Sequence, residues 1–452
     1  MNNKNITDMT VGSPMRHLIK FMLPLLLGNL FQQLYNMVDS IVVGNYVGSN
    51  ALAAVGACGS VNFLFFSLSS GLAIGIGIIV SQFFGAGDEK NVRSTIANSI
   101  YVLVGASILV SMIGLIFCPS LLRLLKTPDT IINDSIIYMR TTCAGIIFIA
   151  LYNGVASTLR ALGDSKTPLY FLILSSIVNV ALDLTFVLAF DMGVFGVALA
   201  TIIAQATAAV TCIIYAYKKV EYFRLTKEQL IPRPRIIVES IRLGVPIALQ
   251  NSMIAISCMA LQGVVNTYGE TVMASYTIIG RIEQIVQQPY SSLGAALTTF
   301  SGQNMGAKKL ERVKKGFRQA TLIVFIFSLC MIPVTYLLGE QIIGIFVKEA
   351  EVIKMGAAAL KINGLCYFAL GMIYVPRAVL NGCGDTGFAM VNGVTEVTCR
   401  VAFSQILTRI PMFGHWGIWL TTVATWITTA FVCVGRYIRG KWRTKSFIER
   451  NT

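Results

Sequence analysis

Long apolar runs separated by short polar segments recur along the whole chain. An α-helix needs about 20 apolar residues to cross the hydrocarbon core of a bilayer, whereas barrel strands are about ten residues long and alternate in polarity. The runs in this chain have the helical length and do not alternate. They predict an all-α polytopic membrane protein with twelve spanning helices, at 18–43, 57–84, 94–118, 131–157, 168–190, 194–217, 241–266, 273–301, 316–338, 355–381, 388–408 and 416–437.

The second half of the chain repeats landmarks of the first half at a nearly constant distance. A shift of 221 residues aligns Asp164 with Asp385, and a shift of 222 aligns Pro24 with Pro246. Six spans return the chain to its starting side, so the copies are parallel repeats related by an axis along the membrane normal. Pseudo-symmetric halves of this kind hold a substrate site between them and alternate access by rocking, which points to a transporter. The predicted organisation is an N-terminal lobe at 1–217, a basic cytoplasmic linker at 218–240, a C-terminal lobe at 241–438 and a basic tail at 439–452.

Composition and charge agree with a membrane location. Charged residues make up 13% of the 452 residues, whereas soluble domains carry about 25%. With the N-terminus inside, 26 of the 36 Lys and Arg residues fall on inner segments and five on outer loops, which is the positive-inside pattern. Both termini are therefore predicted to be cytoplasmic. The net charge of +15 is assigned to loops that face anionic membrane lipids rather than to nucleic-acid binding.

Carboxylates inside two apolar runs of the first half are the main candidates for function. Gln32, Asn36 and Asp39 follow i, i+4, i+7 spacing, so they form a polar stripe on one helix. The run "SSIVNVALDLTFVLAF" carries Asn179 and Asp183 four residues apart. Ionisable residues within a membrane span are expensive and usually functional. Both carboxylates are predicted to lie within roughly 7–12 Å of the outer edge, at a rise of 1.5 Å per residue, and to line one chamber of the first lobe.

Such a pair of carboxylates has two chemical uses. It can take up a proton, or it can stay ionised around a Na⁺ with Asn179 and the hydroxyl of Thr201 as further oxygen ligands. The sequence does not decide between these ions, and a structural hydrogen-bond network between helices is the alternative reading. The repeat gives an internal comparison, because Asp39 corresponds to Leu261 and Asp183 to Ser404. Ion coupling is therefore predicted to be confined to the first lobe.

The second half carries acidic and basic residues at other positions. Glu283 and, one turn later, Gln287 are expected to line the substrate cavity, where Glu283 would meet a cationic substrate; a salt bridge or a helix-end position is the alternative. Glu396 and Arg400 lie four residues apart on one predicted helix, the spacing of an intrahelical ion pair. This pair is read as structural.

Other motifs narrow the class of protein. Gly71 and Gly75 lie four residues apart within an apolar run with no strand before them, so they predict close helix packing rather than a dinucleotide site. No P-loop, H-E-x-x-H or G-x-S-x-G motif is present, and the ten cysteines lack metal-binding spacing. The chain is therefore not expected to be an enzyme, or to use a cofactor or metal beyond H⁺ or Na⁺ as the coupling ion.

Taken together, the motifs resemble those of the multidrug and toxic compound extrusion (MATE) family, in its bacterial DinF-like branch. They are "P-x4-N" and "D-x-x-x-x-G" in the first span, "Q-x-x-GA" after spans 2 and 8, "R-A-x-GD-x-x-x-P" after span 4 and "N-x-x-x-D" in span 5. The resemblance implies a V-shaped pair of six-helix lobes in the bacterial cytoplasmic membrane, acting as a monomer. It also implies that Asp39, Asn179, Asp183 and Thr201 occupy the family's N-lobe cation site.

The resulting hypothesis is a secondary antiporter that exports lipophilic organic cations in exchange for H⁺ or Na⁺. The alternative is a related flippase or exporter of a lipid-linked precursor or an endogenous metabolite. A flippase for a pyrophosphate-linked lipid is expected to have a cationic cavity, whereas the notable charges of the first lobe are acidic. A channel is expected to have a continuous polar lining, whereas the polar residues here cluster in the outer half.

Overall fold

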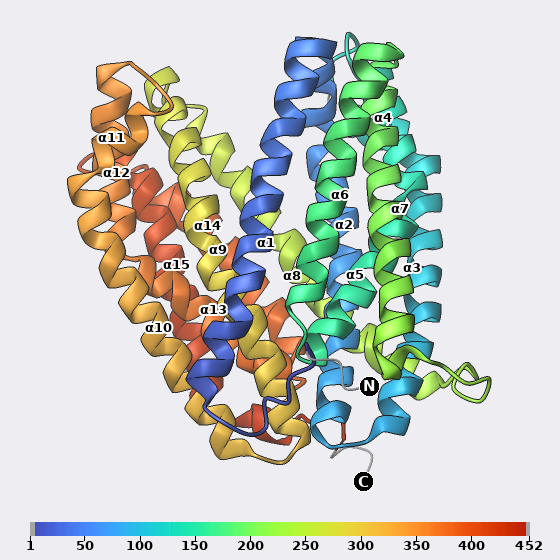
Figure 1. The fold of residues 1–452 in the computed structure, drawn as a ribbon. Coiled ribbons are helices and arrows are strands. Elements are labelled where there is room, and N and C mark those ends of the chain that lie inside the picture. The colour runs from blue at the N-terminus through green and yellow to red at the C-terminus, as the bar shows by residue number, and fades with distance from the viewer. Residues whose placement is uncertain (1–4, 126, 449–452) are drawn as a thin grey trace. The chain divides into compact units, whose positions relative to one another are not determined.

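The computed structural model describes residues 5–125 and 127–448, and helices form nearly all of this part of the chain (Figure 1). Each of the twelve predicted spans coincides with one helix or with one bent pair of helices. The helices of the first half are α1 (Pro14–Val42), α2 (Ser49–Gly85), α3 (Glu89–Leu124), α4 (Ile132–Ala144), α5 (Ile146–Ala161), α6 (Lys166–Leu184) and α7 (Gly193–Lys219). Those of the second half are α8 (Pro234–Val265), α9 (Glu270–Gly306), α10 (Leu310–Leu337), α11 (Gly339–Gly344), α12 (Ala350–Leu365), α13 (Tyr367–Gly382), α14 (Gly387–Leu407) and α15 (Gly417–Ile438).

Short helical turns of other types complete the secondary structure. Two five-residue π-helical turns, η1 (Val43–Val47) and η2 (Thr185–Ala189), continue α1 and α6. Three 3₁₀ turns lie outside the long helices, at η3 (Glu221–Phe223), η4 (Gly414–Trp416) and η5 (Lys441–Thr444). The two π-turns are of interest for function. Such turns are frequent at functional sites, and each follows a helix that carries a candidate carboxylate.

Two of the predicted spans are broken helices, and the two breaks lie at equivalent positions of the internal repeat. The axis bends by 45° between α4 and α5 and by 46° between α12 and α13. Gly145 and Cys366 are the residues at the two breaks, and they lie 221 residues apart, the same shift that the sequence landmarks follow. The repeat is thus present in the backbone as well as in the sequence.

The chain divides into two compact units. The first comprises Met1–Met9 and Leu23–Ala248, and the second comprises Thr10–Met22 and Leu249–Thr452. The sequence assigned the first helix of each repeat to a single lobe, but α1 and α8 each contribute to both units. The divisions fall beside Pro24 and Pro246, the prolines within these two helices. A proline removes one intrahelical hydrogen bond, so each division falls near a point where the backbone hydrogen bonding of the helix is interrupted.

Hydropathy separates the helices into two groups. Seven helices of the described chain are long and apolar enough to cross a membrane, and the two bent pairs raise the number to nine. The three remaining predicted spans lie on α1, α9 and α14, which carry Asp39, Glu283 and the Glu396–Arg400 pair. Asn179, Asp183 and Thr201 lie on α6 and α7, which are apolar enough to span a membrane. A helix that lines a polar or protein-filled space need not be apolar on every side, so these three have the composition expected of helices with a functional face.

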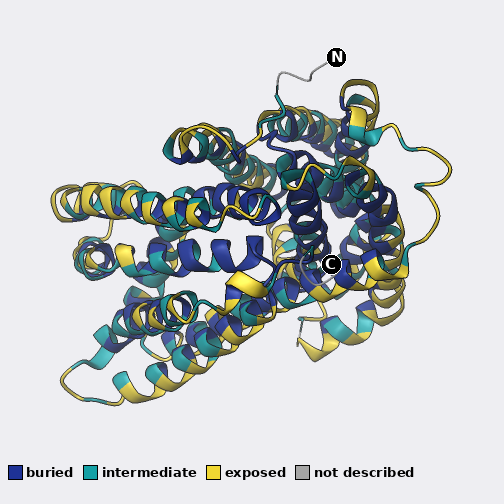
Figure 2. Cartoon of the chain, turned by 90° about the horizontal axis from the view of Figure 1, so that it is seen from below, coloured by how far each residue is buried: buried dark blue, intermediate teal, exposed yellow. Residues whose placement is uncertain are grey.

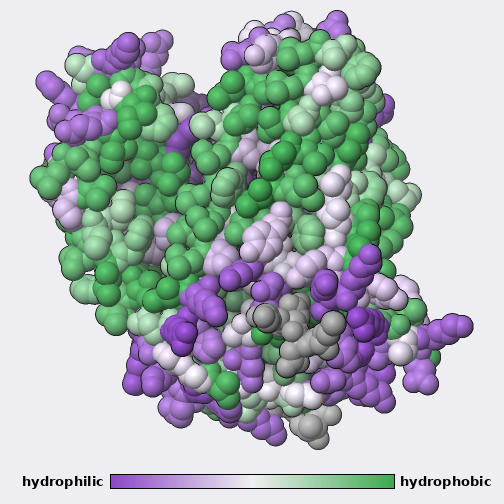
Figure 3. All heavy atoms as spheres, in the orientation of Figure 1, coloured by the Kyte–Doolittle hydropathy of each residue, from purple (hydrophilic) through white to green (hydrophobic). Residues whose placement is uncertain are grey.

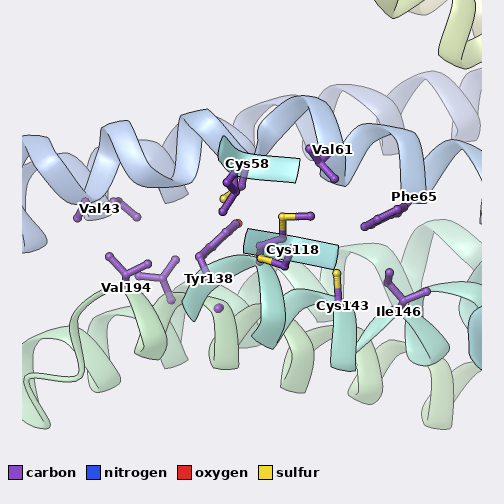
Figure 4. Packing of buried hydrophobic residues seen from close by; sticks show 14 of the residues in the cluster. Val43, Cys58, Val61, Phe65, Cys118, Tyr138, Cys143, Ile146 and Val194 are labelled. Carbon is purple, nitrogen blue, oxygen red and sulfur yellow. The ribbon is translucent and has the colours of Figure 1, made fainter. Parts of the chain in front are cut away.

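Buried and exposed residues lie on different faces of the helices within each unit. Figure 2 shows buried residues on the inward faces of the helices and exposed ones on their outer faces, where a membrane protein meets lipid. In the first unit, apolar residues of α2, α3, α4 and α7 form one cluster (Figure 4), which includes the thiols of Cys58, Cys118 and Cys143. Tyr138 of α4 belongs to this cluster.

The segments predicted to be cytoplasmic gather at one end of each unit. In the first unit, Arg93 pairs with Glu221 at 2.9 Å, and the amide of Thr7 donates to the carbonyl of Leu162. In the second unit, Arg312 donates to the carbonyl of Gly12, and Arg436 pairs with Asp385 at 2.8 Å. On the face shown in Figure 3, hydrophobic residues cover the middle of the helices, and hydrophilic residues gather at this end and at the tips. This distribution is the one expected of membrane-spanning units.

Candidate functional site

The two candidate carboxylates of the first unit lie at equivalent places in their helices. Asp39 lies three residues before the end of α1, and Asp183 one residue before the end of α6. The π-turns η1 and η2 follow directly. A π-turn adds a residue to the helical turn and rotates the side chains that follow it. Both carboxylates therefore sit where the backbone departs from regular α-helix.

The structure brings the two carboxyl groups together. Asp183 is 1% exposed, and the carboxyl groups of Asp39 and Asp183 lie close enough to share a hydrogen bond. An ionised carboxylate only accepts hydrogen bonds, so a bond between two carboxyl groups requires a proton on one of them. The Oδ1 atom of Asp39 is also buried without a hydrogen-bond partner within the described residues. The pair is thus chemically suited to hold a proton or another small cation.

The predicted oxygen ligands lie on the neighbouring helices. Asn179 is 1% exposed and donates from Nδ2 to Oγ1 of Thr201 on α7 at 3.4 Å. The Thr201 hydroxyl donates to the carbonyl of Val197 at 3.1 Å, which fixes its orientation. Asp39, Asn179, Asp183 and Thr201 come from α1, α6 and α7 of one unit. This is the residue set that the sequence named.

Two tyrosines that the sequence did not single out also interact with this group of residues. Tyr35 hydrogen-bonds Thr201 and interacts electrostatically with both carboxyl groups, and Tyr138 of α4 interacts with both as well. Tyr35 precedes Asp39 by four residues, so helical spacing provided a signal for it. Tyr138 shares a face of α4 with Ser135 and Thr142, three residues before it and four after it, and is buried in the apolar cluster (Figure 4).

The other residues of the α1 stripe differ in exposure. Gln32 is half-buried and Asn36 is exposed. The hydroxyl of Ser40 donates to the backbone carbonyl of Asn36 at 2.9 Å. Among the described residues, no group of three or more His, Cys, Asp or Glu side chains is arranged to hold a metal ion. The candidate residues of the first unit supply carboxyl, amide and hydroxyl oxygen atoms.

In the second unit, Glu283 has a partner that the sequence did not suggest. Asn363 of α12 donates from Nδ2 to Oε1 of Glu283 on α9 at 2.5 Å. Within the described chain Glu283 forms no salt bridge with Arg281, which is exposed. Gln287 accepts a hydrogen bond at 3.2 Å from the hydroxyl of Tyr374 on α13. Both side chains predicted to line a cavity are thus tied to the broken helix α12–α13.

Glu396 and Arg400 form an ion pair on α14. The Arg400 Nη2 atom lies 3.0 Å from Oε1 of Glu396, and the two side chains are 6% and 7% exposed. Arg400 also donates to the sulfur of Cys258 on α8 at 2.7 Å. A buried ion pair with a further hydrogen bond compensates much of the desolvation of its charges.

Comparison with known proteins identifies the family. A sequence model of the MatE family matches residues 24–185 and 246–406, one match in each repeat. The chain belongs to the MatE family. It is 29% identical over 446 residues to the probable multidrug resistance protein YpnP of Bacillus subtilis, covering 98% of this chain and 99% of that protein. It is 27% identical to the probable multidrug resistance protein YoeA of the same organism, covering 95% and 94%.

The MatE fold is also that of solved transporters. A structure described as the outward-facing conformation of a multidrug resistance MATE family transporter superposes with a TM-score of 0.91 at 23% identity, covering 99% of this chain and all of the other. The prediction of an all-α membrane protein with the twelve-helix fold of this family is confirmed. Membership in a family of membrane transporters also agrees with the absence of enzyme motifs from the sequence.

Proposed function

We propose that this MatE protein is a secondary active exporter of the bacterial cytoplasmic membrane. It exchanges lipophilic organic cations against an inward gradient of H⁺ or Na⁺, works as a monomer and keeps both termini in the cytoplasm. The coupling ion binds at Asp39 and Asp183, with Asn179 and Thr201 as further ligands. The observation that carries the proposal is the close approach of the half-buried Asp39 carboxyl group to the buried carboxyl group of Asp183.

The carboxyl pair supplies a switch between two charge states. With one shared proton the pair carries one negative charge, and loss of that proton places two negative charges side by side in a low-dielectric environment. Repulsion between them then favours a rearrangement of α1 relative to α6, which the π-turns after both carboxylates can accommodate. Binding of the coupling ion and release of substrate are linked through this rearrangement.

Names of relatives support the choice of substrate. YpnP and YoeA are described as probable multidrug resistance proteins. A negatively charged site in the first unit favours organic cations over anions by simple electrostatics. The chain exposes many large apolar side chains along the helices, which suits a protein surrounded by lipid.

Uptake of ethidium into inside-out vesicles tests the proposal, because an exporter moves its substrate from the cytoplasmic face, here the outside, into the lumen. Asp39→Asn and Asp183→Asn are expected to abolish gradient-driven transport and to leave expression unchanged. Glu311→Gln is the matched control, because it removes a carboxylate that pairs with Lys314 on the exposed end of α10. Imposing ΔpH and ΔNa⁺ separately identifies the ion. Normal pumping by both Asp variants would refute the assignment of the coupling site.

A further inference from the structure

Helix α9 of the second unit carries a polar face that the protein leaves exposed. Thr277, Arg281 and Gln284 follow i, i+4, i+7 spacing and are exposed, and the half-buried Gln288 continues the row one turn later. Residues at these spacings share one side of a helix. α9 is also not among the helices of the described chain that are apolar enough to cross a membrane. Its exposed side therefore does not have the composition of a face that meets lipid tails.

The protein does not neutralise the positive charge on this face. Within residues 5–125 and 127–448, the guanidinium of Arg281 forms no ion pair and no hydrogen bond. Glu283, two residues further on, points to the other side of α9, where it accepts the hydrogen bond from Asn363. The five N–H donors of a permanently charged group are therefore available to an acceptor that is not part of the protein.

The depth of this face distinguishes it from an ordinary surface position. α9 has 37 residues and is about 55 Å long, whereas the hydrocarbon core of a bilayer is about 30 Å thick. Arg281 lies about 17 Å from the start of the helix, and Gln284 and Gln288 lie about 21 and 27 Å from it. A long arginine side chain near a membrane edge snorkels to the headgroups, but two glutamines close to the middle of the helix do not reach them. The row therefore requires a water-accessible space along α9.

The equivalent face of the first unit carries no charge. A shift of 221 residues places Ser60 and Phe63 of α2 at the positions of Arg281 and Gln284. Phe63 is 44% exposed, and the segment Val61–Gly85 of α2 is apolar enough to cross a membrane. The shared fold therefore does not demand a cationic face on this helix, and the difference between the units points to a role in binding.

We propose that Arg281 and Gln284 form a binding site for the carboxylate of an amphipathic substrate, with Arg281 as the residue that determines this specificity. A guanidinium pairs with a carboxylate through two parallel N–H···O hydrogen bonds. Gln284 supplies an amide donor one turn along the same face, and Ile285, which is 52% exposed, offers apolar surface beside it. The role of the site in transport rests on the exporter function proposed above, whereas binding of the carboxylate does not.

Two fluorescent dyes that differ in one carboxylate test the proposal. Rhodamine B has a free carboxylate, and its ethyl ester lacks one, while both dyes carry the same delocalised positive charge. Binding of each dye to the purified full-length protein in detergent is measured by fluorescence anisotropy. We expect R281Q to raise the Kd of rhodamine B about tenfold, the effect of losing a charge-assisted hydrogen bond. The Kd of the ethyl ester should stay unchanged, which also shows that the variant is folded.

Further variants separate the site from net charge and from misfolding. Lysine keeps the charge but not the planar pair of donors, so R281K should retain part of the affinity for rhodamine B. Arg409 donates to Gln405 beyond the end of α14, so R409Q removes a positive charge elsewhere in the same unit and should change neither Kd. If R281Q does not fold, Q284L decides, because it should weaken rhodamine B alone. Equal effects of R281Q on the two dyes, no effect on either, or the same loss in R409Q would each overturn the proposal.

Transport in inside-out vesicles distinguishes this proposal from the exporter function. R281Q should slow the uptake of rhodamine B and leave the uptake of ethidium, which has no carboxylate, unchanged. Absence of ethidium uptake by the wild-type protein would refute the exporter hypothesis and leave the difference in dye affinity standing. Ethidium uptake by the wild-type protein, together with equal rhodamine B affinities of wild type and R281Q, would refute only the carboxylate site.

Discussion

Replacing Gly75 by alanine should destabilise the first unit through a single methyl group. Gly71 and Gly75 of α2 pack against Ala248 and Gly244 of α8, the close helix packing that the spacing of the two glycines predicts. A Cβ atom at Gly75 would lie 2.6 Å from the backbone nitrogen of Gly244 and 2.9 Å from the carbonyl oxygen of Ser240. Ordinary van der Waals contact begins at 3.4 Å. Because both neighbours are backbone atoms, no side chain can rotate away.

The size of the expected loss of stability follows from these short distances. The two helices must separate by most of an ångström, or α8 must bend, to accept the methyl group. Overpacking of a well-packed core costs about 1–3 kcal/mol, and a unit of this size loses roughly 2–4 °C of melting temperature per kcal/mol. We therefore expect Gly75→Ala to lower the melting temperature by several degrees in a thermal scan in detergent.

The matched control is Gly105→Ala in α3. A Cβ atom there meets no atom within 4 Å, and the position is exposed within a helix. Alanine should stabilise this helix by about 0.5–1 kcal/mol, because it loses less backbone entropy than glycine. The two substitutions are chemically identical and should shift the melting temperature in opposite directions. Equal melting temperatures for the two variants would refute the argument from backbone contact.

Three further substitutions test the structure at the ends of the units that are predicted to be cytoplasmic, each by thermal unfolding in detergent. Gly163→Ala should lower the free energy of unfolding by about 1–3 kcal/mol. Gly163 has φ +89°, and the added Cβ atom would collide with the carbonyl oxygen of Thr7; a stability equal to wild type would contradict this. Asp164→Ala should lower the free energy of unfolding by about 1–2 kcal/mol, because the Asp164 carboxylate accepts hydrogen bonds from the backbone amides of Lys166 and Thr167 at the start of α6. Asp164→Asn should retain part of this stabilisation, because its amide oxygen can still accept them. Arg436→Gln should lower the free energy of unfolding by about 3 kcal/mol, because it leaves the buried Asp385 carboxylate without its bidentate ion pair at 2.8 and 3.0 Å. Recovery of stability in the double variant with Asp385→Asn would confirm that the unpaired charge is the cause.

Most of the candidate residues that lie together in the first unit could be named from the sequence. A carboxylate is expensive inside an apolar run, so Asp39 and Asp183 stand out in any membrane helix. Helical spacing then adds Asn179 on the same helix as Asp183. Tyr138 could not be singled out from the sequence, because tertiary packing decides which side of α4 faces the carboxyl groups.

The sequence by itself determined the class of fold, the twelve spans and the repeat, because apolar length and residue spacing are local properties of the chain. Only the tertiary structure decided which helices meet. It joined Glu283 to Asn363, 80 residues away, and divided α1 and α8 beside their prolines. The physical reason is that lipid-facing and protein-facing sides of a membrane helix are both apolar, so hydropathy fixes where a helix lies but not how it is rotated against its neighbours.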